Sequence, residues 1–351
     1  MSTKSYCASI RSTGSAKVPR DIKRGKLLSE VKFPQQFFGL FNVKYSPDGN
    51  DLLTCFGQGA IQVRCPTTGT LKRTIRSGGN YSYPIQCARF NPLHTSKCYA
   101  ASTCGNVFIC DAIQYDYTTF ATEYKNEINS IDVTCDGGNV ITGGKDTFTR
   151  VYDADTTKLK CMYGKEKGKV RNSFDEKQKF HFMRIYCVKS HPRFNEVFLT
   201  GGWDDIVLIW DLRDPYGCVR SIKGPHICGD SIDIRDKIIL TGSWTVRESI
   251  KLWDFGSGEL ISVVMPTNRP SCLGGEYVYA CQFYDGDSTD DQIISGGSGG
   301  EYVEVISLKE NKVMTFLKTN KPCQTLDSYQ DKITYGGMEP CFRIIDYSNC
   351  Y

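Results

Sequence analysis

A short pattern that recurs seven times constrains the fold of this chain more than any other feature. Its clearest copy, at 199–211, reads LTGGWDDIVLIWD, in which a short apolar run, a glycine-containing turn and a second alternating apolar run follow one another. Two such runs joined by a tight turn predict a β-hairpin. The seven copies lie at 53–65, 99–111, 141–153, 199–211, 240–254, 294–307 and 333–346.

The spacing of these hairpins points to a propeller. A further strand is expected before each hairpin, as at 41–49 and 85–92, and another after it, as at 69–76 and 258–264. Repeats of about 40 to 45 residues with four strands each are typical of propeller blades. Helical periodicity is weak throughout, so we expect an all-β fold with seven blades, numbered one to seven in chain order.

The ends of the chain are expected to meet in the last blade. Only 348–351 follow the third strand of blade seven, which therefore lacks an outer strand. The segment 25–33, GKLLSEVKF, has the form of an outer strand but no blade of its own. Because an open ring would leave unpaired strand edges, we assign this segment to blade seven. The domain prediction is a tail at 1–24 and a single propeller at 25–351.

These motifs resemble the WD-repeat family, whose blades carry Gly-His before the first strand, Ser or Thr and Asp around the middle turn, and Trp-Asp after the third strand. The resemblance implies buried hydrogen-bonded tetrads that join the strands of a blade. The matching residues are His181, Thr200, Asp204 and Trp210 in blade four, and His226, Thr241 and Trp253 in blade five. Blade five departs from the pattern at Thr245, and blades three and seven have Tyr152 and Ile345 at the tryptophan position.

Motifs that imitate catalytic sites have simpler interpretations in this repeat. Lys145 and Asp146 in GGNVITGGKD (137–146) precede a strand, whereas a phosphate-binding loop opens a helix. The glycines of 295–302 are expected to supply positive φ in a blade turn. His181 and His226 could serve as general bases, but the resemblance assigns them to structural networks. We find no carboxylate pair, nucleophile elbow or metal-ligand cluster, and expect no catalytic residue, cofactor or metal.

The composition of the chain limits where the protein can be located and which partners it can bind. The 17 cysteines are odd in number and scattered, which favours buried thiols over disulfides. No apolar run is long enough for a membrane span or a secretory signal, so we expect a cytoplasmic protein, without excluding the nucleus. The net charge is +4, but 1–24 alone holds six Lys or Arg and one Asp. The rest is nearly neutral, which argues against direct nucleic-acid reading, while the tail could dock on an acidic filament such as a microtubule.

Aromatic residues are expected to gather at the rim where partners bind WD-repeat propellers. Trp203 and Trp244 each precede the tetrad Asp position, which the resemblance places on the top rim, and the first strands add further candidates. The predicted partner-binding residues are Trp203, Trp244, Arg184, Tyr186, Tyr277, Tyr279, Tyr81 and Phe41. Tyr, Trp and Arg are enriched at interface hot spots, although alternate strand residues could simply pack inside the blades.

We therefore predict a non-catalytic scaffold that binds a peptide or loop of another protein, with apolar and acidic groups pressed against Trp203, Trp244, Arg184 and Tyr186. The preferred hypothesis is that this scaffold works in a cytoplasmic assembly, including a cytoskeletal or ciliary one. A chromatin or ubiquitin-ligase adaptor that reads a short peptide is the alternative, and a propeller enzyme is a third. The charged insertion at 164–180 is either a docking arm over the same rim or a solvated loop.

Overall fold

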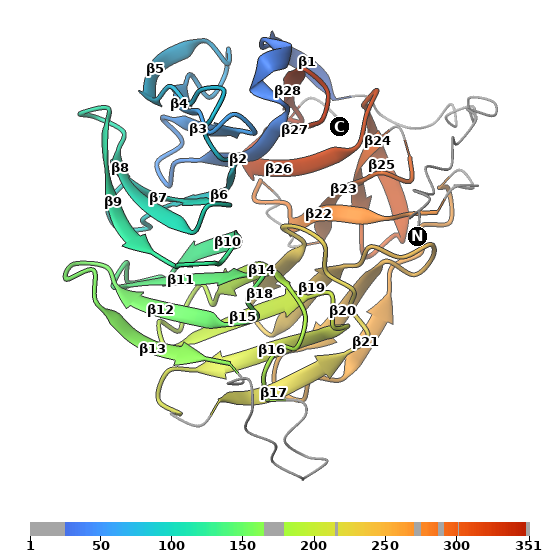
Figure 1. Cartoon of the computed structure of the whole chain (residues 1–351). Coiled ribbons are helices and arrows are strands. Elements are labelled where there is room, and N and C mark those ends of the chain that lie inside the picture. The colour runs from blue at the N-terminus through green and yellow to red at the C-terminus, as the bar shows by residue number, and fades with distance from the viewer. Residues whose placement is uncertain are drawn as a thin grey trace, which may run out of the picture.

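The computed structural model describes residues 25–164, 179–214, 217–269, 275–286, 291–300 and 302–348. Within these ranges the chain forms 28 strands, arranged as seven four-stranded antiparallel sheets around a central channel (Figure 1). The predicted all-β, seven-bladed propeller is confirmed. The tail at 1–24 and residues 165–178 of the insertion lie outside the described residues.

Each of the first three blades takes four consecutive strands, from the channel outward. Blade one contains β2 (Leu40–Tyr45), β3 (Leu52–Phe56), β4 (Ile61–Arg64) and β5 (Leu71–Arg76). Blade two contains β6 (Ile85–Phe90), β7 (Lys97–Ser102), β8 (Asn106–Asp111) and β9 (Asp116–Thr122). Blade three contains β10 (Ile128–Val133), β11 (Asn139–Gly144), β12 (Thr149–Asp153) and β13 (Leu159–Tyr163).

Blades four, five and six follow the same order. Blade four contains β14 (Ile185–Ser190), β15 (Val197–Gly202), β16 (Ile206–Asp211) and β17 (Cys218–Lys223). Blade five contains β18 (Ile232–Arg235), β19 (Ile238–Gly242), β20 (Ile250–Asp254) and β21 (Leu260–Val263). Blade six contains β22 (Val278–Phe283), β23 (Gln292–Gly297), β24 (Tyr302–Ser307) and β25 (Lys312–Lys318).

Blade seven joins the two ends of the described chain. Its strands are β26 (Cys323–Tyr329), β27 (Lys332–Gly337), β28 (Cys341–Asp346) and, as the outer strand, β1 (Lys26–Lys32). In Figure 1 the blue β1 lies among the red strands of this blade. An ion pair of 3.0 Å between Arg343 and Glu30 supports the pairing. This is the closure that the sequence predicted. A short 3₁₀ helix, η1 (Gln35–Phe37), then leads to β2.

The apolar core lies between neighbouring blades. One buried cluster contains Leu53 and Cys55 of blade one together with Ala100 and Cys110 of blade two, and another joins Leu40 of blade one to Phe342 of blade seven. Of the 14 cysteines among the described residues, eight are buried and six are half-buried, all as free thiols. The eight buried cysteines therefore serve as small apolar residues of the core.

The paired glycines of the repeat are required by close packing. A Cβ on Gly201 would lie 2.6 Å from the Ile232 side chain of the next blade, and one on Gly202 would lie 2.1 Å from the carbonyl oxygen of Arg184. The second glycine of the pair meets a carbonyl in the same way at Gly144, Gly297 and Gly337. Gly296 and Gly297 both lie outside the positive-φ region, so the expectation that they supply positive φ is wrong. They provide room for the neighbouring strand.

Candidate functional site

The predicted tetrad of blade four forms a continuous buried chain of hydrogen bonds. His181 contacts Asp204 through Nδ1 at 2.8 Å and Thr200 Oγ1 through Nε2 at 2.7 Å, and the indole of Trp210 donates to the same Oγ1 at 2.7 Å. All four residues are buried. Because both ring nitrogens of His181 are engaged and no solvent reaches them, this histidine holds strands together and cannot act as a general base on a substrate.

Blade five keeps only half of that arrangement. Trp253 donates to Thr241 Oγ1 at 2.9 Å, but His226 is absent from this contact, so its predicted place in a buried tetrad is wrong. Its Nδ1 contacts Asp205 of blade four at 2.6 Å, and its side chain is 29% exposed. The physical reason is Thr245, which stands where a carboxylate would hold the imidazole inside the blade. His226 instead lies at the mouth of the channel.

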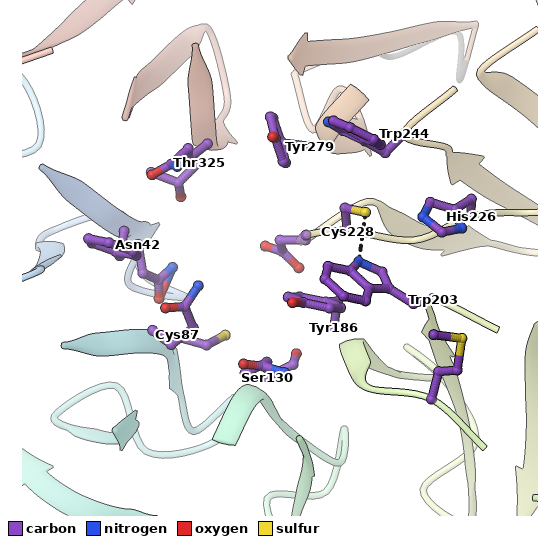
Figure 2. Close-up of a pocket in the computed structure, with 17 residues that line it drawn as sticks. Asn42, Cys87, Ser130, Tyr186, Trp203, His226, Cys228, Trp244, Tyr279 and Thr325 are labelled. Atoms are coloured by element: carbon purple, nitrogen blue, oxygen red, sulfur yellow. Dashed lines mark hydrogen bonds between the residues drawn. The ribbon is translucent and has the colours of Figure 1, made fainter. Parts of the chain in front are cut away.

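The mouth, meaning the end of the channel at which the inner strands begin, holds a pocket of about 580 Å³. We call it the mouth pocket. Five of the predicted partner-binding residues line it: Phe41, Tyr186, Trp203, Trp244 and Tyr279. Figure 2 shows Tyr186, Trp203 and Trp244 on one side of the pocket and Asn42 and Thr325 on the other.

A repeated β-bulge directs side chains into this pocket. Six of the seven inner strands, β2, β6, β10, β14, β22 and β26, change register at the same place, one residue after their first paired position. A bulge of this kind re-aims a side chain relative to the regular alternation of the strand. The bulged residues all line the mouth pocket, and they are Phe41, Gln86, Asn129, Tyr186, Tyr279 and Gln324.

The aromatic side of the pocket is built from contacts within blade four and between blades five and six. Trp203 stacks on Tyr186, with ring centroids 5.2 Å apart and an interplanar angle of 29°, and donates its indole N–H to Cys228 Sγ at 3.0 Å. Trp244 packs against Tyr277 and Tyr279, at 4.7 and 6.4 Å between centroids. Each tryptophan remains 38% exposed, so both rings are held in place and still offer area to a ligand.

Blade five supplies the floor of the pocket with a tight segment between β17 and β18. A Cβ on Gly229 would lie 2.3 Å from the carbonyl oxygen of Tyr279, so only glycine permits this approach. The flanking Cys228 and Asp230 both line the pocket. Burial raises the pKa of the Cys228 thiol to about 11, so this thiol is not an activated nucleophile.

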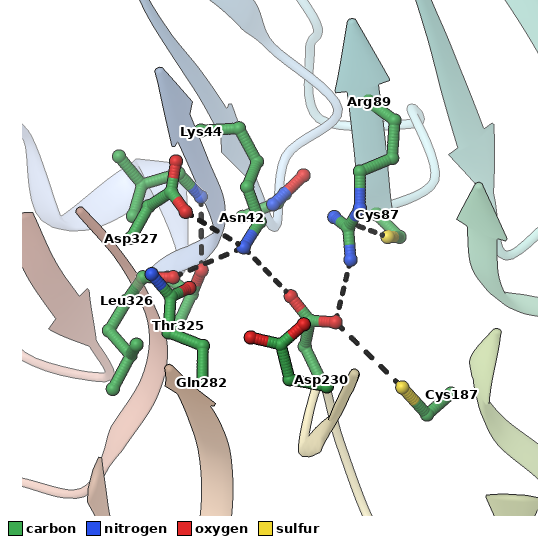
Figure 3. A network of polar contacts seen from close by, with 12 residues as sticks. Asn42, Lys44, Cys87, Arg89, Cys187, Asp230, Gln282, Thr325, Leu326 and Asp327 are labelled. Carbon is green, nitrogen blue, oxygen red and sulfur yellow. Dashed lines mark hydrogen bonds and ion pairs between the residues drawn. The ribbon is translucent and has the colours of Figure 1, made fainter. Parts of the chain in front are cut away.

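Asp230 is the centre of a network of ion pairs between half-buried side chains, shown in Figure 3. It contacts Arg89 at 2.6 Å and Lys44 at 3.0 Å, and these two cations also contact Asp132 and Asp327, at 3.6 and 3.3 Å respectively. Burial alone would raise the pKa of the Asp230 carboxyl, but Arg89 and Lys44 hold it well below its ordinary range. Asp230 is therefore charged, and it ties blade five to blades one and two.

Three predicted partner-binding residues do not line the mouth pocket. Arg184 pairs with Glu127 at 2.7 Å. Tyr277 supports Trp244 from beside the pocket, with a φ of 44° that is unusual for an aromatic residue. Tyr81 is 99% exposed and stands apart.

Seven polar residues of the pocket were not predicted from the sequence: Asn42, Asn129, Ser130, Cys228, Asp230, Gln324 and Thr325. Aligning the inner strands by repeat position would have found the three amides, because each stands at the bulge or directly after it. Among the described residues, no group of His, Cys, Asp and Glu could hold a metal ion. The searched part of the chain contains no helix with the length and apolarity to span a membrane.

Comparisons with known proteins match parts of the chain. The family described as WD domain, G-beta repeat matches residues 175–211, which include the complete tetrad of blade four. Cell division control protein 4 of Candida albicans is 29% identical over 80 residues, or 22% of this chain and 11% of that protein. Methylosome protein WDR77 of Xenopus laevis is 26% identical over 98 residues, or 28% of this chain and 25% of that protein.

Proposed function

The chain is a seven-bladed WD-repeat β-propeller, and from this premise we propose that it is a non-catalytic scaffold that binds a partner protein at the mouth pocket. Propellers of this family typically mediate protein–protein interaction. One observation carries the proposal: Phe41, Tyr186, Trp203, Trp244 and Tyr279, drawn from four blades, converge on a single pocket. Large aromatic rings that a monomer leaves partly exposed are favoured anchors of interfaces.

The rigidity of the pocket supports binding of a peptide or loop. Its rings are fixed by stacking, most of its polar groups stand on inner strands, and Asp230 fastens its floor to blades one and two. A surface that is ordered before binding loses little conformational entropy on association. The predicted contact of acidic groups with Arg184 is revised in this proposal, because Glu127 already engages that guanidinium.

The proposed setting is a cytoplasmic assembly, cytoskeletal or ciliary, in which the basic tail docks on an acidic filament. The support is the charge of 1–24, with six basic residues against one acidic residue. The alternative, a chromatin or ubiquitin-ligase adaptor that reads a short peptide, is supported by the names of the two similar proteins. One relative is by name a methylosome protein and the other a cell division control protein, which favours membership of a regulated assembly.

A matched pair of double variants tests the pocket. The full chain, purified with its cross-linked partners, is compared with Trp203→Ala/Trp244→Ala and with Tyr81→Ala/Tyr124→Ala, whose rings are exposed away from the pocket. We expect the first variant to lose the partners that the second retains, while both keep the thermal unfolding midpoint within a few degrees. Partners that survive the tryptophan variant would show that binding occurs elsewhere.

Two further measurements distinguish the cytoskeletal assembly from the adaptor. Co-sedimentation with microtubules should be sensitive to salt and should disappear when residues 1–24 are removed, because exposed charges are screened at high ionic strength. Fractionation of cells should place the protein in the cytoplasm. Nuclear recovery, with no filament binding at low salt, would favour the adaptor.

A further inference from the structure

We propose that the mouth pocket accepts a cationic side chain of the partner, specifically an arginine guanidinium. The inference rests on the proposed function, because it names the anchor that the partner inserts. Three independent features of the pocket lead to it: the charge of its floor, the chemistry of its walls, and the hydrogen-bonding groups that its inner strands leave unused.

The first feature is an excess of negative charge beneath the pocket. The network around Asp230 contains the cations Lys44, Arg89 and Lys189 and the carboxylates Asp132, Asp230, Asp233 and Asp327. The remaining charged residues that line the lower channel are Arg193, Arg235, Asp236 and Asp285, two of each sign. One carboxylate is therefore in excess, in a channel where burial reduces screening by solvent.

The second feature is the composition of the pocket walls. Tyr186, Trp203, Trp244 and Tyr279 offer ring faces, which carry the negative part of the aromatic quadrupole and attract cations. Among the described residues that line the pocket, none is a lysine or arginine. An acidic anchor would thus meet ring faces and Asp230 without a lysine or arginine of the pocket lining to pair with, and His226 already contacts Asp205.

The third feature concerns hydrogen-bond acceptors on the bulged residues of blades three and seven. The side-chain oxygen Oε1 of Gln324 is buried and has no donor within the described part of the chain. Asn129 uses its Nδ2 to donate to the carbonyl oxygen of Ile185 at 2.8 Å, which leaves its Oδ1 as an acceptor. A guanidinium presents five N–H donors on a plane that also stacks on aromatic rings, so it fits this pocket better than an ammonium.

The test uses the full chain with ¹⁵N-labelled tryptophan, because its four indoles separate the pocket from the core. Trp203 and Trp244 line the pocket, whereas Trp210 and Trp253 are buried inside blades four and five, where they donate to Thr200 and Thr241. The probes are capped pentapeptides, Ala-Ala-X-Ala-Ala, in which X is arginine, citrulline, lysine, glutamate or tryptophan. Citrulline keeps the shape of arginine and removes its charge.

We expect the arginine peptide to shift the indole resonances of Trp203 and Trp244 and to leave those of Trp210 and Trp253 unchanged. Citrulline and glutamate should bind at least about tenfold more weakly, and lysine at an intermediate level. Gln324→Leu should weaken the arginine peptide about fivefold, because it removes the unused acceptor, whereas Tyr124→Ala, at an exposed ring outside the pocket, should not.

The inference is overturned if the citrulline or tryptophan peptide binds as tightly as the arginine peptide, or if the arginine peptide at about 10 mM leaves both pocket indoles unshifted. The proposed function fails separately, when natural partners survive Trp203→Ala/Trp244→Ala. A partner that depends on both tryptophans but inserts a neutral residue would leave the scaffold role standing and remove only the arginine anchor.

Discussion

At the scale of single residues, Thr200 joins two side chains through one oxygen atom. Its Oγ1 accepts the indole N–H of Trp210 and contacts His181 Nε2, both at 2.7 Å, and it is fully buried. When a buried donor loses its acceptor, the folded protein is destabilised, because water cannot reach the donor and replace the hydrogen bond. The hydroxyl therefore matters through the two groups it satisfies.

Thr200→Val is expected to lower the free energy of unfolding by about 2 kcal/mol, because the indole N–H of Trp210 would remain buried without an acceptor. The midpoint of denaturant unfolding measures this loss. Thr122→Val is the matched control, since the hydroxyl of Thr122 donates to Asn106 at an exposed site. Equal midpoints for the two variants would contradict a structural role for the blade-four tetrad.

Two half-buried thiols should differ strongly in reactivity. Burial raises the pKa of the Cys228 thiol to about 11, whereas at Cys65 hydrogen bonds from Thr68 outweigh burial and lower the pKa of the thiol. Since the thiolate is the nucleophile, we expect iodoacetamide at pH 8 to modify Cys65 well before Cys228, by a factor of about 100. Peptide mapping by mass spectrometry measures both rates, and the opposite order would refute the prediction.

Residue-scale prediction from the sequence succeeded where one repeat carried the whole motif and failed where the motif was incomplete. Blade four holds all four tetrad residues, and they form the bonds that the resemblance implied. In blade five, His226 stands at the position of the motif, but this blade has no carboxylate to hold it, and the imidazole contacts Asp205 of blade four instead. A single repeat does not contain that information, because the competing partner lies in the preceding repeat.

At the scale of elements, blade three shows that one role can be filled by different chemistry. Glu123 takes the place of the histidine, accepts the hydroxyl of Tyr152 at 3.0 Å and pairs with Arg150 at 3.0 Å. Arg150 in turn pairs with Asp146. In the sequence this blade is recognised only by its departure from the motif, with Tyr152 at the tryptophan position. A carboxylate and an arginine thus connect the segment before the inner strand to the third strand of this blade.

The bulges of the inner strands illustrate another limit of prediction at this scale. The alternation of apolar residues predicts strands but does not show that β14 changes register between Ile185 and Cys187. Without that bulge, Tyr186 would follow the regular alternation and its ring would be expected between blades, which is the alternative that the sequence left open. Six equivalent bulges settle the direction of six side chains, and these residues define the mouth pocket.

The outer strand β1 should be essential to blade seven. Removal of residues 1–24 is expected to leave the unfolding midpoint nearly unchanged, whereas removal of 1–33 exposes the edge of β28 and removes the ion pair between Glu30 and Arg343. Hydrogen exchange should show loss of protection in Cys341–Asp346, and a synthetic peptide of 25–33 should restore it. Unchanged protection after the longer truncation would mean that β1 does not stabilise the ring.

At the scale of the whole molecule, the ring is held from the outside by β1 and from the inside by charge. The sequence predicted the seven blades and the outer closure because both depend on repeat count and on a missing strand. It did not predict the inner network, because Lys44 and Asp230, or Arg89 and Asp230, are far apart along the chain. Such pairs become visible only after the inner strands are placed around one channel.

The pH dependence of stability should reveal this network. Burial would raise the pKa of Asp230, but Arg89, Lys44 and Lys189 lower it below its ordinary value. A carboxyl whose folded pKa is lowered contributes stability that is fully present above its unfolded pKa, about 3.9, and is lost as pH falls through the lower folded pKa. Asp230→Asn should therefore cost about 2 to 4 kcal/mol at every pH between 7 and 5, because it leaves buried cations with fewer partners.

Denaturant unfolding of the wild-type protein and of Asp230→Asn between pH 7 and 3 measures this difference. The difference in free energy of unfolding should stay constant down to about pH 5. It should become smaller only in stronger acid, where Asp230 of the wild-type protein is protonated and its ion pairs are lost. Asp236→Asn is the control, because Asp236 forms an exposed pair with Arg193 that contributes less than about 1 kcal/mol. If the difference disappeared between pH 6 and 5, Asp230 would not be held charged by its neighbours, and the negative floor proposed for the mouth pocket would be lost with it.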